Sequence, residues 1–155
     1  MRVHIGGDHA AYELQRDLVA WLGEQGHEVV DHGPSVYDAL DDYPVFVLRA
    51  AQAVAADAGS LGVVLGGSGN GEQMAANKVR GVRAALCYST ELAGLAREHN
   101  DAQVVSIGAR MHTVEAAREI VATFLATSFS GEPRHQRRID MMRAYEDDGT
   151  LPDLP

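Results

Sequence analysis

The sequence predicts an α/β fold: a single Rossmann-like, doubly wound, parallel sheet of five strands with helices on both faces, followed by a basic C-terminal helix. Two observations support this fold class. Short apolar runs alternate with helical patterns along the chain, and each run is too short for a typical helix. Apolar strands joined by helical crossovers are typical of parallel sheets that are covered on both faces and have right-handed connections.

The expected strands are short apolar stretches bounded by glycine or polar residues. Because each one precedes a helical pattern, their carboxyl ends should meet along one edge of the sheet, which is where such folds bind ligands. The strands are 2–6 (RVHIG), 27–32 (HEVVDH), 61–67 (LGVVLGG), 82–88 (VRAALCY) and 102–108 (AQVVSIG).

The expected helices lie between these strands. Leu14 and Leu18 recur on one face of the first, Pro44 opens the second and Thr113 caps the fifth. A further helix should begin near Pro133. The first five cover 10–25, about 44–57, about 70–79, 89–99 and 113–127.

Length, charge and cysteine content limit the possible functions. The 155 residues suit one domain, which we place at 1–146 with a tail at 147–155. The net charge of −9 argues against nucleic acid or an anionic membrane as a partner, and no apolar run approaches the roughly 20 residues that span a bilayer. The single cysteine, Cys87, cannot form an internal disulfide, which suits a soluble protein of the cytoplasm.

The glycine-rich segment LGGSGNGEQMAANK follows the third expected strand. Its glycines allow a sharp turn that points several backbone N–H groups into one concavity in front of a helix, as in an anion-binding nest. Glu72 and Gln73 stand where a P-loop has Lys and Ser/Thr, which argues against a nucleoside triphosphate. The dinucleotide fingerprint also fails, because a third glycine would be needed at position 72.

Glu72 has two possible roles at this stage. In the first turn of a helix it could simply stabilise the helix dipole, an effect of roughly 0.3 to 1 kcal/mol. If the nest stabilises a developing oxyanion, the same carboxylate could instead remove a proton from the adjacent carbon, as in the enolisation of a sugar carbonyl.

Other candidate residues would complete such a site. Arg134 and Arg138 share one face of the last helix and could grip a phosphate, with Arg110 as a third ligand, although a solvated basic face or a surface ion pair would also explain them. His99 and Asn100 lie at the end of the fourth helix, where His99 could donate a proton and Asn100 could form a left-handed cap. The two could also be only a capping pair without a catalytic role.

Asp8 and His9 follow the first strand and could bind sugar hydroxyls or orient one another, although Asp8 could serve only as a helix N-cap. The histidines show no metal-ligand spacing, so we predict no metal cofactor.

Five separated motifs, in order, resemble ribose-5-phosphate isomerase B in its actinobacterial form, within the sugar-phosphate isomerase family that also includes galactose-6-phosphate isomerase subunits. The resemblance runs from residue 2 to about 146 and leaves out the tail. The motifs are GGDHAAYELQ, DDYPVF, GSGNGEQMAANKVRGVRAALCYS, LAREHNDAQVVSIGARMHT and RHQRRID.

The resemblance implies a cofactor-independent interconversion of ribose 5-phosphate and ribulose 5-phosphate through an enediolate. It makes Glu72 the base between C2 and C1 and His99 the proton donor for ring opening. It also implies a homodimer or homotetramer with the site at the subunit interface. The residues implied in substrate binding are Asp8, His9, Gly67, Ser68, Gly69, Asn70, Gly71, Asn100, Arg110, Arg134 and Arg138.

The chain departs from many family members at one position. They have a cysteine base at the end of the third strand, whereas this chain has Gly66, and Glu72 follows about one turn later. Cys87 is expected in the core. Two alternatives stay open: an isomerase of another tetrose or hexose phosphate, and a non-catalytic module that binds a sugar phosphate.

Overall fold

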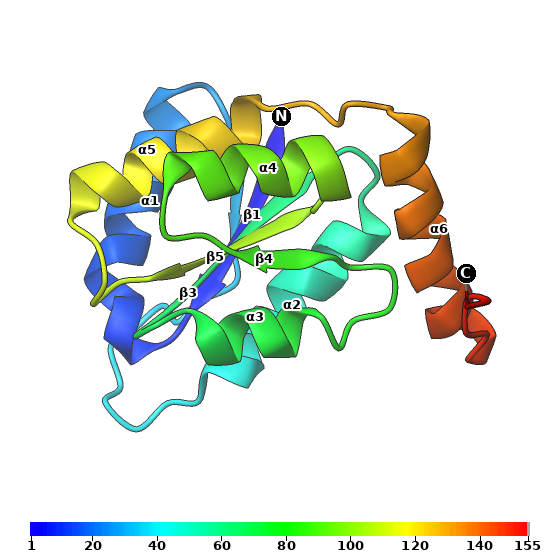
Figure 1. The fold of residues 1–155 in the computed structure, drawn as a ribbon. Helices are drawn as coiled ribbons and strands as arrows, with labels where there is room; N and C mark the ends of the chain where they lie inside the picture. Colours follow the sequence, from blue (N-terminus) through cyan, green and yellow to red (C-terminus); the bar gives the residue numbers. More distant parts are fainter. Residues whose placement is uncertain (155) are drawn as a thin grey trace.

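The computed structural model describes residues 1–154 and has the predicted architecture, with five parallel strands and helices on both faces (Figure 1). All four strand pairings are parallel. The strand order is β2-β1-β3-β5-β4. The strands are β1 (Arg2–Gly7), β2 (Glu28–Asp31), β3 (Leu61–Gly66), β4 (Ala84–Leu86) and β5 (Val104–Gly108).

The chain changes direction across the sheet at β1. It moves outward from β1 to β2 and then crosses back to β3 on the other side of β1. The carboxyl ends of β1 and β3 therefore form the topological switch point, where ligands bind in sheets of this kind. The two segments GGDHA and GGSGNGE leave the sheet at this point.

The helices agree with the expected ones within a few residues, with two informative differences. The first begins as the 3-10 turn η1, because the side chain of Asp8 accepts from Ala10 N at its start. The third ends at Ala76, because the Asn77 amide pairs with both backbone groups of Ala84. The helices are η1 (His9–Ala11), α1 (Tyr12–Glu24), α2 (Tyr43–Ala56), α3 (Asn70–Ala76), α4 (Thr90–Asn100), α5 (Val114–Ala126) and α6 (Pro133–Asp148).

Two hydrophobic layers cover the sheet. Helices α1, α4 and α5 pack on one face around Leu18 and Phe124, and α2 and α3 pack on the other around Val47. Val63 and Val64 are adjacent in β3 and fully buried, and they belong to opposite layers, as the alternation of side chains along a strand requires. This two-sided burial explains the continuous apolar run of β3.

Cys87 lies just beyond the short strand β4 and belongs to the larger layer. Burial raises the pKa of its thiol to about 11. The expectation that Cys87 is a core residue is confirmed, and so high a pKa leaves almost no thiolate at neutral pH.

Helix α6 stands at the β4 edge of the sheet, beside the C-terminal end of α4 (Figure 1). His135 and Ile139 are its buried residues. Its other end is held by an ion pair between Asp147 and Arg80 and by the Glu146 carboxylate, which accepts from Gly81 N. Among the described residues, no helix combines the length and the hydropathy needed to cross a membrane.

The C-terminal end of α4 is fixed by two arginines. We expected Asn100 as a left-handed cap, but Asn100 ends the helix and Asp101 adopts the left-handed conformation, with φ 42° and ψ 46°. Arg97 Nη1 donates to Asp101 Oδ1 at 2.8 Å, and Arg83 donates to the backbone oxygens of Asn100 and Asp101, each at 2.8 Å. These contacts stabilise a conformation that costs energy for a residue other than glycine.

Candidate active site

A cavity of about 470 Å³ lies at the switch point, where β1, β3 and β5 end. It brings together residues from four separate segments of the sequence. Its lining residues are Asp8, His9, Ala10, Tyr43, Gly67, Ser68, Gly71, Glu72, Arg110 and Met111.

The glycine loop between β3 and α3 is held from two neighbouring segments. Ser106 Oγ, buried in β5, donates to Gly69 O at 2.7 Å, and Tyr88 Oη donates to Ser68 O at 2.9 Å. Gly69 has φ +83° and lies against the backbone of Ile107 and Gly108, where a Cβ would be 3.1 to 3.2 Å from main-chain atoms. The loop therefore needs glycine at position 69 both for its conformation and for its close packing.

Glu72 lies in the first turn of α3 and is only 5% exposed. Burial raises the pKa of its carboxyl group, and the negative charge of Asp8 raises it further, while hydrogen bonds from the backbone N–H groups of Glu72 and Gly69 oppose the rise. A carboxylate that served only the helix dipole would be most stable when exposed and ionised. The burial of Glu72 instead suits a base whose pKa lies closer to neutrality.

Gly66 makes room for this carboxyl group. A Cβ built on Gly66 would overlap the Glu72 side chain, lying 2.8 Å from Oε2 and nearer still to Oε1 and Cδ. A residue larger than glycine at position 66 is therefore incompatible with the observed position of the Glu72 carboxyl group. In this chain the glycine at position 66 and the buried position of the Glu72 carboxyl group therefore depend on each other.

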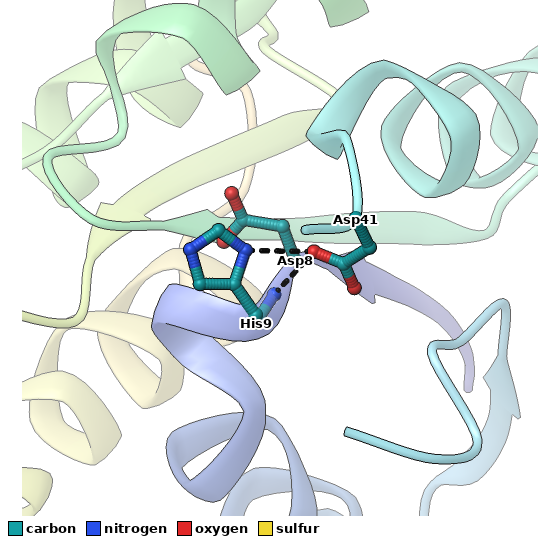
Figure 2. A group of neighbouring side chains, drawn as sticks. All are labelled: Asp8, His9 and Asp41. Atoms are coloured by element: carbon teal, nitrogen blue, oxygen red, sulfur yellow. Dashed lines mark hydrogen bonds and ion pairs between the residues drawn. The ribbon is translucent and has the colours of Figure 1, made fainter. Parts of the chain in front are cut away.

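His9 is oriented by Asp41, from the loop before α2, and not by Asp8 as one of our expectations had it (Figure 2). Asp41 Oδ1 accepts from His9 N at 2.9 Å and lies 2.8 Å from His9 Nδ1. This hydrogen bond raises the pKa of His9. Asp8 is both the N-cap of η1 and a wall of the cavity, and burial raises its pKa.

Asp8, His9 and Asp41 are also the one group in residues 1–154 with three potential metal-ligand atoms within 4.8 Å of one another (Figure 2). The ligand atoms of His9 and Asp41 already bond each other, so a cation would have to displace that contact. The absence of a metal requirement stays a prediction.

Arg110 enters the cavity beside the glycine loop. Its backbone N donates to Gly67 O at 3.1 Å, and its Nη1 would lie 3.5 Å from a Cβ on Gly67. Within the described part of the chain its guanidinium has no ion-pair partner, which leaves its donors available for an anion. The predicted grouping of Arg110 with Glu72 and Asp8 is present in the structure.

The remaining predicted residues lie elsewhere. His99 and Asn100 end α4, which returns from the carboxyl edge of the sheet to the amino end of β5. Roughly 15 Å of sheet separates the two edges at five residues per strand. Arg134 and Arg138 are on α6, next to this end of α4 (Figure 1). One chain therefore holds two separate halves of the predicted site.

Sequence reasoning missed two residues of the first half. Tyr43 lines the cavity, and its ring fills the space where a Cβ on Gly71 would lie, 2.7 Å from Cζ. Asp41 orients His9. Both occur in the quoted motif DDYPVF, but the long loop from 31 to 44 gave no indication of which side chains turn inward.

Comparison with known proteins identifies the family. A family model described as Ribose/Galactose Isomerase matches residues 3–142. The chain belongs to this family. The ribose-5-phosphate isomerase B of Mycolicibacterium paratuberculosis is 55% identical over 155 residues, which are 100% of this chain and 98% of the relative. The enzyme of the same name from Escherichia coli is 37% identical over 145 residues, covering 94% of this chain and 96% of the relative.

Solved structures agree in fold. The structure of Mycoplasma genitalium ribose-5-phosphate isomerase B with bound ribulose-5-phosphate matches with a TM-score of 0.91 and 40% identity, over 95% of this chain and 97% of that one. The alignment with the Mycolicibacterium relative includes residues 147–155, although the family model ends at 142. A domain boundary at 146 stays a prediction.

We predict that Glu72→Gln stabilises the protein at neutral pH. The folded state raises the pKa of this carboxyl group, so the folded form binds the proton more tightly than the unfolded chain does. Ionised Glu72 therefore lowers the free energy of unfolding at pH values above about 4.3, the pKa of a glutamate in the unfolded chain. Below that pH the effect disappears. Denaturant titrations at fixed protein concentration should give the glutamine variant a higher free energy of unfolding than the wild type at pH 7.5, and no such difference near pH 3.5. A loss at pH 7.5 would contradict the effect of burial.

We predict that Gly66→Ala inactivates by displacing the Glu72 carboxyl group. Its kcat should fall by about 10²-fold, the scale for loss of a general base. The double variant Gly66→Ala/Glu72→Gln should be no worse than Glu72→Gln alone, since the two changes remove one function. Gly23→Ala, where a Cβ meets nothing within 4 Å, is the matched control. Full activity of Gly66→Ala would refute the steric constraint.

Proposed function

We propose that the chain interconverts ribose 5-phosphate and ribulose 5-phosphate through an enediolate, without a cofactor. The observation that supports this most directly is the buried carboxyl group of Glu72, with its raised pKa, beside a glycine loop at the switch point. The names of the relatives, and the ribulose-5-phosphate in the Mycoplasma structure, support the choice of substrate.

Glu72 carries the proton between C2 and C1. Its raised pKa makes it a stronger base than an exposed carboxylate. The backbone N–H groups of Gly67–Gly71 stabilise the negative charge that develops on the sugar oxygens. Asp8 and His9 bind hydroxyl groups from the other side of the cavity. Asp41 keeps His9 in one orientation during this step.

The phosphate and the ring oxygen need the second half of the site. Arg134 and Arg138 lie one turn apart on α6 and, with Arg110, supply planar guanidinium groups that suit phosphate oxygens. His99 protonates the ring oxygen as the furanose opens, and Asn100 binds a hydroxyl group. Because these residues lie across the sheet from Glu72, we infer that they come from a second copy of the chain.

The protein is therefore proposed to act as a homodimer or as a homotetramer built from such dimers. A two-fold axis would place the α4 and α6 ends of each copy over the cavity of the other and form two equal sites. The net charge of −9 leaves nucleic acid and anionic membranes as poor partners. We place the reaction in the cytoplasm, which suits a chain with one unpaired cysteine.

A complementation experiment should show that the site is shared. Glu72→Gln and His99→Asn should each be inactive on ribose 5-phosphate. A mixed dimer then has one site with both defects and one site with none. Co-refolding at equal amounts should restore about one quarter of wild-type activity, since half of the dimers are mixed and each has one intact site. No recovery, with mixed dimers verified by mass, would place both residues in a site within one chain.

Proton exchange distinguishes catalysis from simple binding. In deuterated water, turnover of ribose 5-phosphate should incorporate solvent deuterium into the product. In Glu72→Gln the rate of this incorporation should fall at least 10²-fold, while inhibition by phosphate should be unchanged. A panel of tetrose, pentose and hexose phosphates under the same conditions tests the substrate. Saturable binding without exchange would support a non-catalytic module, and faster turnover of a tetrose or hexose phosphate would replace ribose 5-phosphate as the substrate.

A further inference from the structure

His135 is a buried histidine that the proposed reaction does not use. It lies on α6 between Arg134 and Arg138 and is only 3% exposed. Its ring faces that of His99, with 4.2 Å between the ring centroids and 37° between the planes. The His99–His135 pair is thus a direct side-chain contact between α4 and α6.

Ser130 holds the other side of His135. Its Oγ lies 2.8 Å from His135 Nδ1 and also accepts from Glu132 N, at the start of α6. The backbone N of the same serine donates to Glu98 O, one residue before His99. Ser130 therefore joins the start of α6, the ring of His135 and the last turn of α4.

The surroundings of His135 favour the neutral form of its ring. Burial lowers the pKa of His135, and the positive charges of His99, Arg134 and Arg138 lower it further. A neutral imidazole can stack on the ring of His99 when His99 carries a proton, whereas a second cation at this distance would repel it. A phosphate bound by the two arginines would also lie close to this pair.

We propose that His135 is a positioning residue, which fixes the imidazole of His99 for protonation of the ring oxygen and joins it to the arginines that bind the phosphate. The proposal rests on the role given to His99 in the proposed function. The tilted contact between the two rings and the hydrogen bonds of Ser130 join α4 to α6. The distance between the proton donor and the phosphate is then set within one chain, before any partner is bound.

Two substitutions separate the stacking from the hydrogen bond. His135→Phe keeps a planar ring against His99 but loses the bond to Ser130. His135→Asn keeps a polar group near Nδ1 but loses the ring. If stacking positions His99, turnover of ribose 5-phosphate should fall by about 10-fold to 10²-fold in the asparagine variant, the scale for a misplaced catalytic group, and the phenylalanine variant should recover most of it.

The acyclic substrate shows whether the effect is specific. Exchange of the C1 hydrogen of ribulose 5-phosphate needs no ring opening, so His135→Asn should leave it within about twofold of wild type. His27→Asn, just before β2, is the matched control and should change neither rate. Equal loss of turnover and exchange, together with a lower melting temperature, would show that His135 only packs the fold and would overturn the proposal.

A double-mutant cycle completes the test. In the His99→Asn background, His135→Asn should cause no further loss of turnover, because it acts through His99. If His99→Asn abolishes ring-dependent turnover and His135→Asn does not reduce it, the positioning role is wrong and the proposed function stands. If His99→Asn leaves that turnover unchanged, the assigned role of His99 is wrong, and the positioning role falls with it.

Discussion

The arrangement of the cavity depends on one constraint, which is the burial of a carboxyl group against a residue that has no side chain. Glu72 packs against Gly66, where any Cβ would overlap its carboxyl group. The negative charge of nearby Asp8 disfavours ionisation of Glu72. Burial raises the pKa of this carboxyl group, which suits the base that we propose it to be. The glycine at the end of β3 would thus contribute to the proposed acid–base chemistry, although it has no functional group.

The direction of the strands imposes a second constraint. In a parallel sheet, each crossover helix returns the chain to the amino edge, so residues at the end of α4 cannot reach residues at the start of α3. A site that uses both sets must be completed by another chain. The proposed oligomer follows from the connectivity of the strands together with the residues that the family resemblance assigns to one site.

The periodicity of the sequence was enough to predict the five strands, the six helices and the switch-point cavity, because apolar runs and glycine loops are local signals. The contribution of Asp41 and Tyr43 was not predictable, since their positions depend on a long loop without periodicity. The left-handed residue was predicted one position too early, at Asn100 instead of Asp101. Asp101 is stabilised by Arg83 and Arg97, and such side-chain contacts cannot be inferred from the local sequence pattern.

The two halves of the proposed site differ in how they are built, and the difference has a functional consequence. The Glu72 half is formed by backbone turns at the end of a central strand and is bonded to the neighbouring strand through Ser106. The other half is on α6, a polar helix at the sheet edge that is held by His135, Ile139 and a few ionic contacts at its far end. Its geometry therefore depends on α4, through Ser130 and the two histidine rings. Docking of a second chain would then bring the proposed proton donor and the arginines of α6 to the cavity together. The proposed base, acid and phosphate-binding groups would be assembled by the same association.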